Sequence, residues 1–313
     1  MMQTSTSPTA QPTTHVFACG NCGAELVVAM DVRTATCAYC ASPAVVERPT
    51  PVGRPEPRFV IGFARNAELA KKSLAAWIKK QSILCDGGIR TATVEGLRGI
   101  YLPAYLYSAV ARSTYSAEIG ENYTEVQTYT TTVNGKLVTR TRTVTKTEWR
   151  QLSGSHVGYV NDVVVTASKG LPNAELQRVE PFDMRELRRY SPGLISGWIT
   201  EEPSLTADEC RKLARDEAIE EEARRLGRFM PGDSHRTLRF STSLERESWD
   251  YVLVPIWVMA VRWSPSKPPL RVLINGQTGQ AGGKAPISPI RVAILVVLIL
   301  AFIVGIVLWA GSR

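Results

Sequence analysis

The chain has 313 residues, a formal net charge of +8 and six cysteines. This length allows one to three domains, and the basic excess fits an anionic partner, either nucleic acid or a membrane surface. Residues 1–24 contain no charged side chain and no apolar run precedes the first cysteine, so a cleavable secretory signal is not expected.

Two Cys-x-x-Cys pairs near the start carry the strongest chemical signal. Residues 1–15 are mostly Thr, Ser, Pro and Gln, which predicts a disordered lead. The two pairs are Cys19 with Cys22 and Cys37 with Cys40, fourteen residues apart. Each pair can present two thiolates to one face of a tetrahedral ion. We therefore expect a four-cysteine zinc ribbon over 16–46 whose Zn2+ is structural, because four thiolates leave no open position for catalysis.

Other interpretations of these cysteines fit less well. Disulfides would need an oxidising compartment, and a redox-active motif would need only one pair. Some zinc ribbons bind nucleic acid, but residues 19–40 carry one arginine against two carboxylates and a single aromatic ring. Nucleic acid is therefore not the expected partner, and contact with protein or a spacer role is favoured.

The next two segments predict a linker and a helix. Residues 47–58 contain four prolines, which favours an extended, semi-rigid spacer. Asn66 can cap a helix over 67–81 with Leu69, Leu74, Trp77 and Ile78 on one face. We expect this face to pack on the adjoining β-rich domain, and an interfacial helix against lipid headgroups is the alternative.

A β-rich antiparallel domain with two or three helices is predicted over 59–286, which makes the fold class α+β. Thr206 can cap a long helix to residue 229, where Glu220 with Arg224 and Glu221 with Arg225 suit pairs on a solvated face. Asn134-Gly135 predicts a hairpin turn. The expected strands are 100–115, 125–133, 136–148, 158–167, 236–249, 251–263 and 270–274.

Two segments of this domain resemble each other. Residues 253–261 repeat the proline, aromatic and apolar positions of residues 101–109 at an offset of 152. We interpret this as a duplicated half-domain.

The end of the chain predicts a transmembrane helix over 290–310. Residues 292–310 are nineteen uncharged residues, fourteen of them Val, Ile, Leu or Phe. A helix of this length spans about 28 Å, close to the thickness of a bilayer's hydrocarbon core. A buried core helix is the alternative, but a helix that is apolar all round has no solvent face. We expect a single-pass tail anchor in the cytoplasmic (inner) membrane, with the bulk of the chain in the cytoplasm.

Several segments resemble a bacterial family of largely uncharacterised zinc-ribbon membrane proteins. They are residues 98–107 (RGIYLPAYLY), 190–192 (YSP), 253–257 (LVPIW) and 273–279 (LINGQTG). Members are often labelled primosomal-helicase-like or replication-factor-Y-like, and some relatives are associated with phage-shock-type envelope-stress systems. The resemblance implies a recruiting or scaffolding role, with membrane-remodelling stress proteins as partners. The helicase label does not suit this chain, because residues 279–285 are one residue short of a phosphate-binding loop and lack its Ser or Thr.

No catalytic residue is predicted from the sequence. His15 falls in the lead, and His156 has the surroundings of a loop histidine without a nucleophile elbow. Cys85 and Cys210 stand alone, without ligand spacing. The leading hypothesis is a non-enzymatic, cytoplasm-facing membrane adaptor or scaffold. The alternatives are a membrane-tethered nucleic-acid-binding protein and a hydrolase whose site assembles only in the fold.

Overall fold

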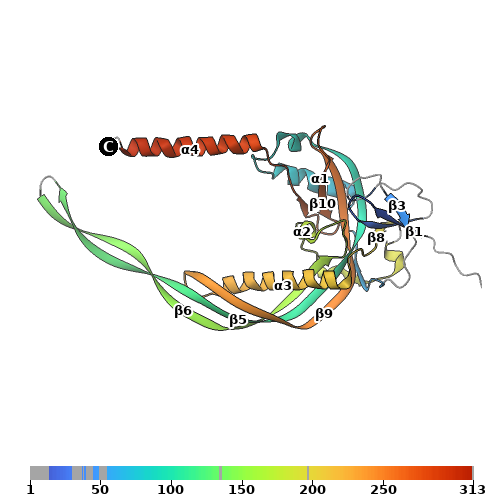
Figure 1. Cartoon of the computed structure of the whole chain (residues 1–313), viewed down its shortest axis with the longest axis horizontal. Helices are drawn as coiled ribbons and strands as arrows, with labels where there is room; N and C mark the ends of the chain where they lie inside the picture. The colour runs from blue at the N-terminus through green and yellow to red at the C-terminus, as the bar shows by residue number, and fades with distance from the viewer. Residues whose placement is uncertain are drawn as a thin grey trace, which may run out of the picture. The chain divides into compact units, whose positions relative to one another are not determined.

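The computed structural model describes residues 14–29, 37, 39, 45–48, 55–133, 136–195 and 197–311. Over these residues the protein is mixed α/β, with one large sheet, four α-helices and a C-terminal apolar helix among them (Figure 1). The chain folds as two compact units, which divide the range 59–286 that the sequence suggests is one domain. Unit 1 contains Met1–Leu106, Val164–Cys210 and Asp250–Arg313, and unit 2 contains Tyr107–Val163 and Arg211–Trp249.

The strands of unit 1 continue from the cysteine-bearing ribbon into the rest of the sheet. Across the described residues the strand order is β11-β10-β9-β5-β8-β2-β1-β3, while β4 pairs with β7 and β9. The strands confined to unit 1 are β1 (Thr14–Cys19), β2 (Glu25–Ala29), β3 (Val45–Arg48), β4 (Phe59–Ile61), β7 (Leu187–Arg189), β8 (Ile199–Glu201), β10 (Leu270–Asn275) and β11 (Ala281–Gly283).

Strands β5 (Thr93–Val133) and β9 (Ser234–Arg262) lie next to each other and pass through both units. Their repeated segments, 101–109 and 253–261, are therefore on neighbouring strands. Ile100, Leu102 and Ala104 alternate along β5 and pack with Val254 and Ile256 of β9 in the main core. This period of two is what a strand with one face on a core requires.

Helix α1 (Ala67–Lys79) begins as the sequence predicts. The Asn66 side chain accepts a hydrogen bond from the Leu69 amide at 3.0 Å. Ala70 and Leu74 are buried in a cluster with Met259 of β9 and strand β10. The helix therefore packs on the sheet, as the sequence interpretation favours.

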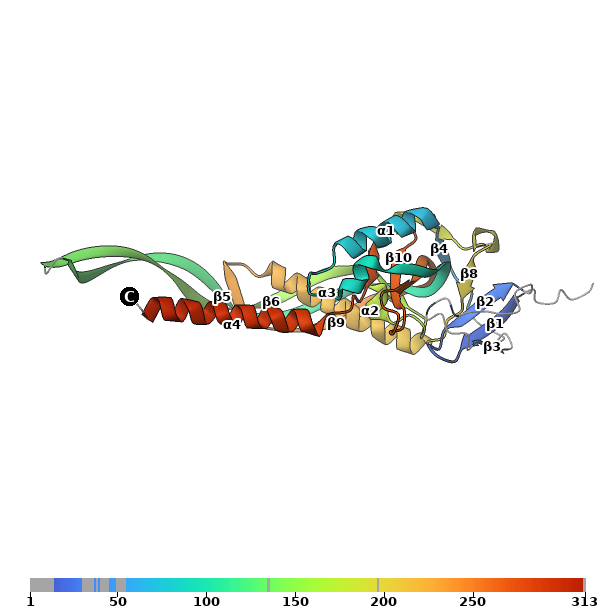
Figure 2. The same cartoon turned by 90° about the horizontal axis from the view of Figure 1, so that it is seen from above.

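Unit 2 consists of long paired strands and most of one helix. Strand β6 (Lys136–Thr166) pairs with β5, and the two form a long twisted ribbon (Figure 1). Helix α3 (Ala207–Phe229) runs beside β5 and β9 in both views (Figure 2). The expected strands 125–133, 136–148, 158–167, 236–249 and 251–263 are thus parts of three continuous strands, and the turn at residues 134 and 135 lies outside the described residues.

Helix α3 starts with a capping box. The Thr206 hydroxyl accepts from the Glu209 amide, and the Glu209 carboxylate accepts from the Thr206 amide at 2.7 Å. The expected surface pairing holds in part, since Glu221 binds both Arg224 and Arg225. The interpretation of this glutamate- and arginine-rich part of the helix as a solvated face is wrong at Glu222, because the Glu222 side chain is wholly buried.

The C-terminal helix is α4 (Pro289–Gly311). Its 22-residue stretch Pro289–Ala310 is long and apolar enough to cross a membrane. The first turn of α4 is hydrogen-bonded to an earlier segment of unit 1. The Arg291 guanidinium donates to the carbonyls of Ile83 at 2.9 Å and Cys85 at 2.8 Å. An antiparallel bridge between Cys85 and Ile287 lies next to these contacts. The remaining elements are α2 (Asn173–Leu176) and the 3-10 turns Gly87–Thr91, Met184–Glu186 and Pro192–Ile195.

Candidate metal centre

The first Cys-x-x-Cys pair forms a tight knuckle between β1 and β2. The Cys19 amide donates to the Ala24 carbonyl at 2.8 Å, and the Gly23 amide donates to the Cys19 carbonyl at 2.9 Å. Gly23 has a φ of +74°, a conformation that a side chain would strain. The turn thereby brings the thiols of Cys19 and Cys22 to one side of the strands.

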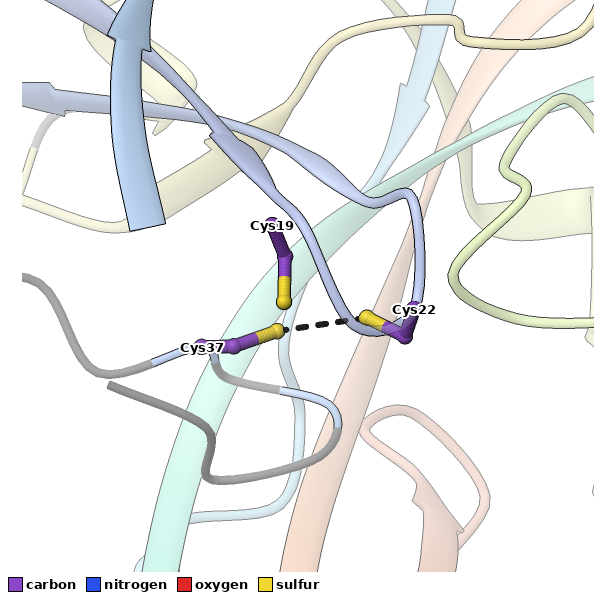
Figure 3. A group of neighbouring side chains, drawn as sticks. All are labelled: Cys19, Cys22 and Cys37. Carbon is purple, nitrogen blue, oxygen red and sulfur yellow. Dashed lines mark hydrogen bonds between the residues drawn. The ribbon is translucent and has the colours of Figure 1, made fainter. Parts of the chain in front are cut away.

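Cys37 completes a group of three thiols (Figure 3). The three sulfur atoms lie within 4.8 Å of one another, and the Cys22 and Cys37 sulfurs are 3.4 Å apart. That separation is far longer than the roughly 2.05 Å of a disulfide, so these two sulfurs are not bonded to each other. Tetrahedral zinc thiolates with Zn–S bonds of about 2.3 Å place their sulfurs about 3.8 Å apart. The three cysteines therefore fit a bound metal ion, while Cys40 lies outside the described residues.

A buried polar cluster lies next to the thiols. The Tyr39 hydroxyl donates to one carboxyl oxygen of Glu201, and the Ser168 hydroxyl donates to the other at 2.5 Å. Burial raises the pKa of the Glu201 carboxyl to about 8, against the opposing effect of these two hydrogen bonds. Burial likewise raises the pKa of the Tyr39 phenol. The carboxyl thus fixes the tyrosine two residues beyond Cys37.

The knuckle is in contact with the rest of unit 1. Strand β2 pairs with β8, with Leu26 opposite Glu201 and Val27 opposite Thr200. A side chain at Gly170 would place its Cβ only 2.4 Å from the Cβ of Ala24, so the two segments are in close contact. This corrects the expectation that linker 47–58 separates the ribbon from the β-rich domain, although residues 49–54 of that linker lie outside the described residues.

Within the described residues, none of the remaining candidates belongs to the thiol group. His15, expected in the lead, belongs to β1. Cys85 and Cys210 are buried, and burial raises the pKa of the Cys210 thiol to about 11. His156 lies in strand β6 and not in a loop.

His156 is part of a polar network inside unit 2. Its Nδ1 lies 2.7 Å from Oε1 of Glu222, which also accepts from the Ser113 hydroxyl at 3.1 Å. The other Glu222 oxygen is buried with no partner among the described residues. A pocket of about 340 Å³ beside His156 is lined by the hydroxyl-bearing residues Ser113, Thr114, Ser155, Ser241 and Ser243.

Sequence reasoning does not identify Glu201, Ser168 or Glu222. Glu201 and Ser168 are 33 positions apart and meet only because β8 is inserted between β5 and β2. Glu222 is one of three consecutive glutamates in a predicted helix. Three consecutive helical residues cover about 200° of the helix circumference, so they cannot all lie on one narrow solvent face.

The fold and this centre define a mixed α/β protein with a three-cysteine group able to bind a metal ion and a C-terminal helix of membrane-spanning length. The chain is similar to the uncharacterised protein YdjG of Bacillus subtilis (strain 168), with 23% identity over 251 residues that cover 77% of this chain and 67% of that protein. No protein-family model matches the chain. No solved structure matches it.

Proposed function

We propose that this protein is a tail-anchored membrane adaptor with a structural zinc centre, which recruits protein partners in a membrane-stress response. Helix α4 is the observation that carries the proposal. None of its most apolar stretch is buried. A helix this apolar and this exposed is stable in a bilayer and costly in water, because the fourteen Val, Ile, Leu and Phe residues of its 292–310 stretch favour insertion by about 4–8 kcal/mol.

Zinc is the metal we assign to the thiol group. Thiolate ligands select zinc among the divalent ions common in a reducing compartment, and the Cys-x-x-Cys spacing suits a tetrahedral site. Cys40 is the fourth ligand in this proposal. With four thiolates the ion has no open position, so its role is to stabilise the knuckle and the strands joined to it.

The recruiting role is supported by the strand order around the knuckle and by the family resemblance. The knuckle belongs to the main sheet through β2 and β8, so its outer edge, strand β3, ends the strand order on that side within the described residues. Edge strands can accept another chain by strand addition. The resemblance supplies the class of partner, which is membrane-remodelling stress proteins.

Three measurements on the full-length chain test the proposal. Fractionation should place the protein with membranes, and deletion of residues 292–310 should release it. Purification under reducing conditions should yield about one zinc per chain, and Cys19→Ser should abolish it. Proximity labelling with the anchor intact should then identify partners that the anchor deletion loses. A soluble full-length protein, or one without zinc, would contradict the proposal.

A hydrolase is the second candidate, and the His156–Glu222 contact is what favours it. A carboxylate on Nδ1 orients an imidazole so that the other ring nitrogen can act as a base. The pocket beside His156 supplies hydroxyl groups around it. Hydrolysis of chromogenic esters or phosphoesters that is abolished by His156→Ala, with zinc content unchanged, would establish this candidate.

A further inference from the structure

We infer that a cleft in unit 1, beside the knuckle, is a binding site for a phosphate-bearing anion. The cleft has a volume of about 420 Å³, within the range of small-molecule sites. One wall is formed by Asn21 and Cys22 of the knuckle, and Tyr39 lies beside them. Basic side chains from three separate segments, Arg178, Arg271 and Lys284, line the rest.

The charge of Arg271 is already satisfied within the cleft. Its guanidinium makes two contacts of 2.9 Å with the Glu175 carboxylate and donates to the Gly170 carbonyl at 2.7 Å. It also lies 6.0 Å from the centre of the Tyr39 ring. Arg271 therefore holds its wall in place and contributes little net charge.

Arg178 and Lys284 differ from Arg271 in this respect. Neither has an ion pair with any residue in the described part of the chain. Among the described residues that line the cleft, Glu175 is the only acidic one, and it pairs with Arg271. The cleft thus presents two basic side chains that have no carboxylate partner among the described residues, and such side chains bind phosphate.

The backbone brings the segments that carry these two residues close together. Gly282 of β11 lies against Arg178, where an added Cβ would come within 2.6 Å of the Arg178 Cβ and 2.8 Å of its carbonyl oxygen. Lys284 lies two residues later. A glycine at this position lets β11 approach closely, so the chain that carries Lys284 passes directly beside Arg178.

The position of Lys284 indicates where the anion can come from. Helix α4 starts at Pro289, five residues on, so Lys284 stays within about 18 Å of the helix start even in a fully extended chain. If α4 enters a bilayer, phospholipid headgroups are within reach of the cleft. A soluble phosphate compound offers the same chemistry. The lipid source rests on the proposed membrane anchor, whereas phosphate binding itself does not.

The experiment compares two probes on the full-length protein in a neutral detergent. The probes are short-chain phosphatidylglycerol and inorganic phosphate, with short-chain phosphatidylcholine as the zwitterionic reference of zero net charge, and binding is followed by calorimetry. We expect the double variant Arg178→Gln with Lys284→Gln to weaken binding of the anionic probe at least about tenfold, because each charged contact is worth roughly that factor. Lys284→Arg should retain binding.

A matched control removes the same charge elsewhere. Lys136 and Arg140 are exposed on unit 2 and have no ion pair within the described residues, so Lys136→Gln with Arg140→Gln should leave binding unchanged. Tighter binding of phosphatidylglycerol than of phosphate identifies a headgroup, and equal binding identifies a soluble phosphate. Failure of both probes to bind, or an equal loss in the control, would overturn the inference.

Zinc content and membrane fractionation of the same samples separate this inference from the proposed function. Phosphate binding by a protein that is not anchored would leave the inference standing while the adaptor proposal fails. Full zinc content in the double variant would also exclude misfolding of the knuckle as the cause of lost binding.

Discussion

The buried carboxyl of Glu201 gives the sharpest test of how the metal centre is supported. Its two oxygens accept hydrogen bonds from the hydroxyls of Tyr39 and Ser168, and the side chain has no exposed surface. Glu201→Leu fills a similar volume but accepts neither bond. Each buried O–H donor left without an acceptor costs about 1–3 kcal/mol, so we expect a loss of about 2–6 kcal/mol in the free energy of unfolding.

Urea denaturation of full-length protein in detergent measures this loss, and a double-mutant cycle assigns it. Tyr39→Phe removes one of the two donors in advance, so the cost of Glu201→Leu should be smaller in that background by about 1–3 kcal/mol. Glu201→Gln retains an acceptor and is the control, with a cost below that of the leucine variant. A leucine variant within about 0.5 kcal/mol of the parent, or strict additivity in the cycle, would refute the reasoning.

Three further predictions concern the interior. Thiol alkylation at pH 8 after metal chelation should label Cys22, which is partly exposed, but spare Cys85 and Cys210 until urea unfolds the chain, since both are buried and burial raises the pKa of the Cys210 thiol. Mass spectrometry counts the labels, and early labelling of Cys85 or Cys210 would contradict their burial. Glu222→Leu should destabilise unit 2 by about 2–4 kcal/mol, because two donors lose their acceptor and one of them is partly solvated. Hydrogen exchange of helix α3 should rise in that variant, and unchanged protection would show that the network is dispensable. Gly170→Val should speed zinc release to a chromogenic chelator, because the added side chain would push Ala24 and the knuckle away from residue 170. Gly62→Val is the control and should not change the rate, since a Cβ at residue 62 has no atom within 4 Å.

Features that depend on a few neighbouring residues could be predicted from the sequence. The cap at Asn66 and the capping box at Thr206 are such features, because their donors and acceptors are three residues apart. The knuckle turn is another, since Gly23 and the Cys-x-x-Cys spacing determine it locally. The apolar C-terminal helix needs no partner in the chain, so its composition alone predicts it.

Features that depend on strand order could not be predicted in this way. Strand β8 has only three residues, yet it joins the ribbon to the body by pairing with β2 on one side and β5 on the other. No local pattern at Ile199–Glu201 indicates either partner. Strands β5 and β9 are also each continuous where the sequence predicts two strands, because residues 116–124 and Asp250 lack the apolar alternation used to delimit strands.

The pairing of β8 changes what the metal is expected to stabilise. If the ribbon were an independent module on a flexible arm, chelation would unfold it alone. In the structure β8 pairs in parallel with β5, with Ile199 opposite Ile100, and Glu201 is shared between β8 and the thiol region. Structural zinc binds zinc-finger peptides with about 10–16 kcal/mol of apparent free energy, and part of that should be transmitted to unit 1 through this strand.

Chelation should therefore lower the thermal unfolding midpoint of unit 1 as a whole. Trp198 and Trp257 report on it, because both lie in an aromatic cluster with Phe63, whose ring stacks on Trp198 at 3.9 Å. Their fluorescence transition in detergent should shift to lower temperature when zinc is removed and return when zinc is restored. Cys19→Ser should show the low midpoint with or without added zinc. An unchanged tryptophan transition, with increased hydrogen exchange confined to β1–β3, would mean that the ribbon folds on its own and that its contacts with β8 add little to the stability of the body.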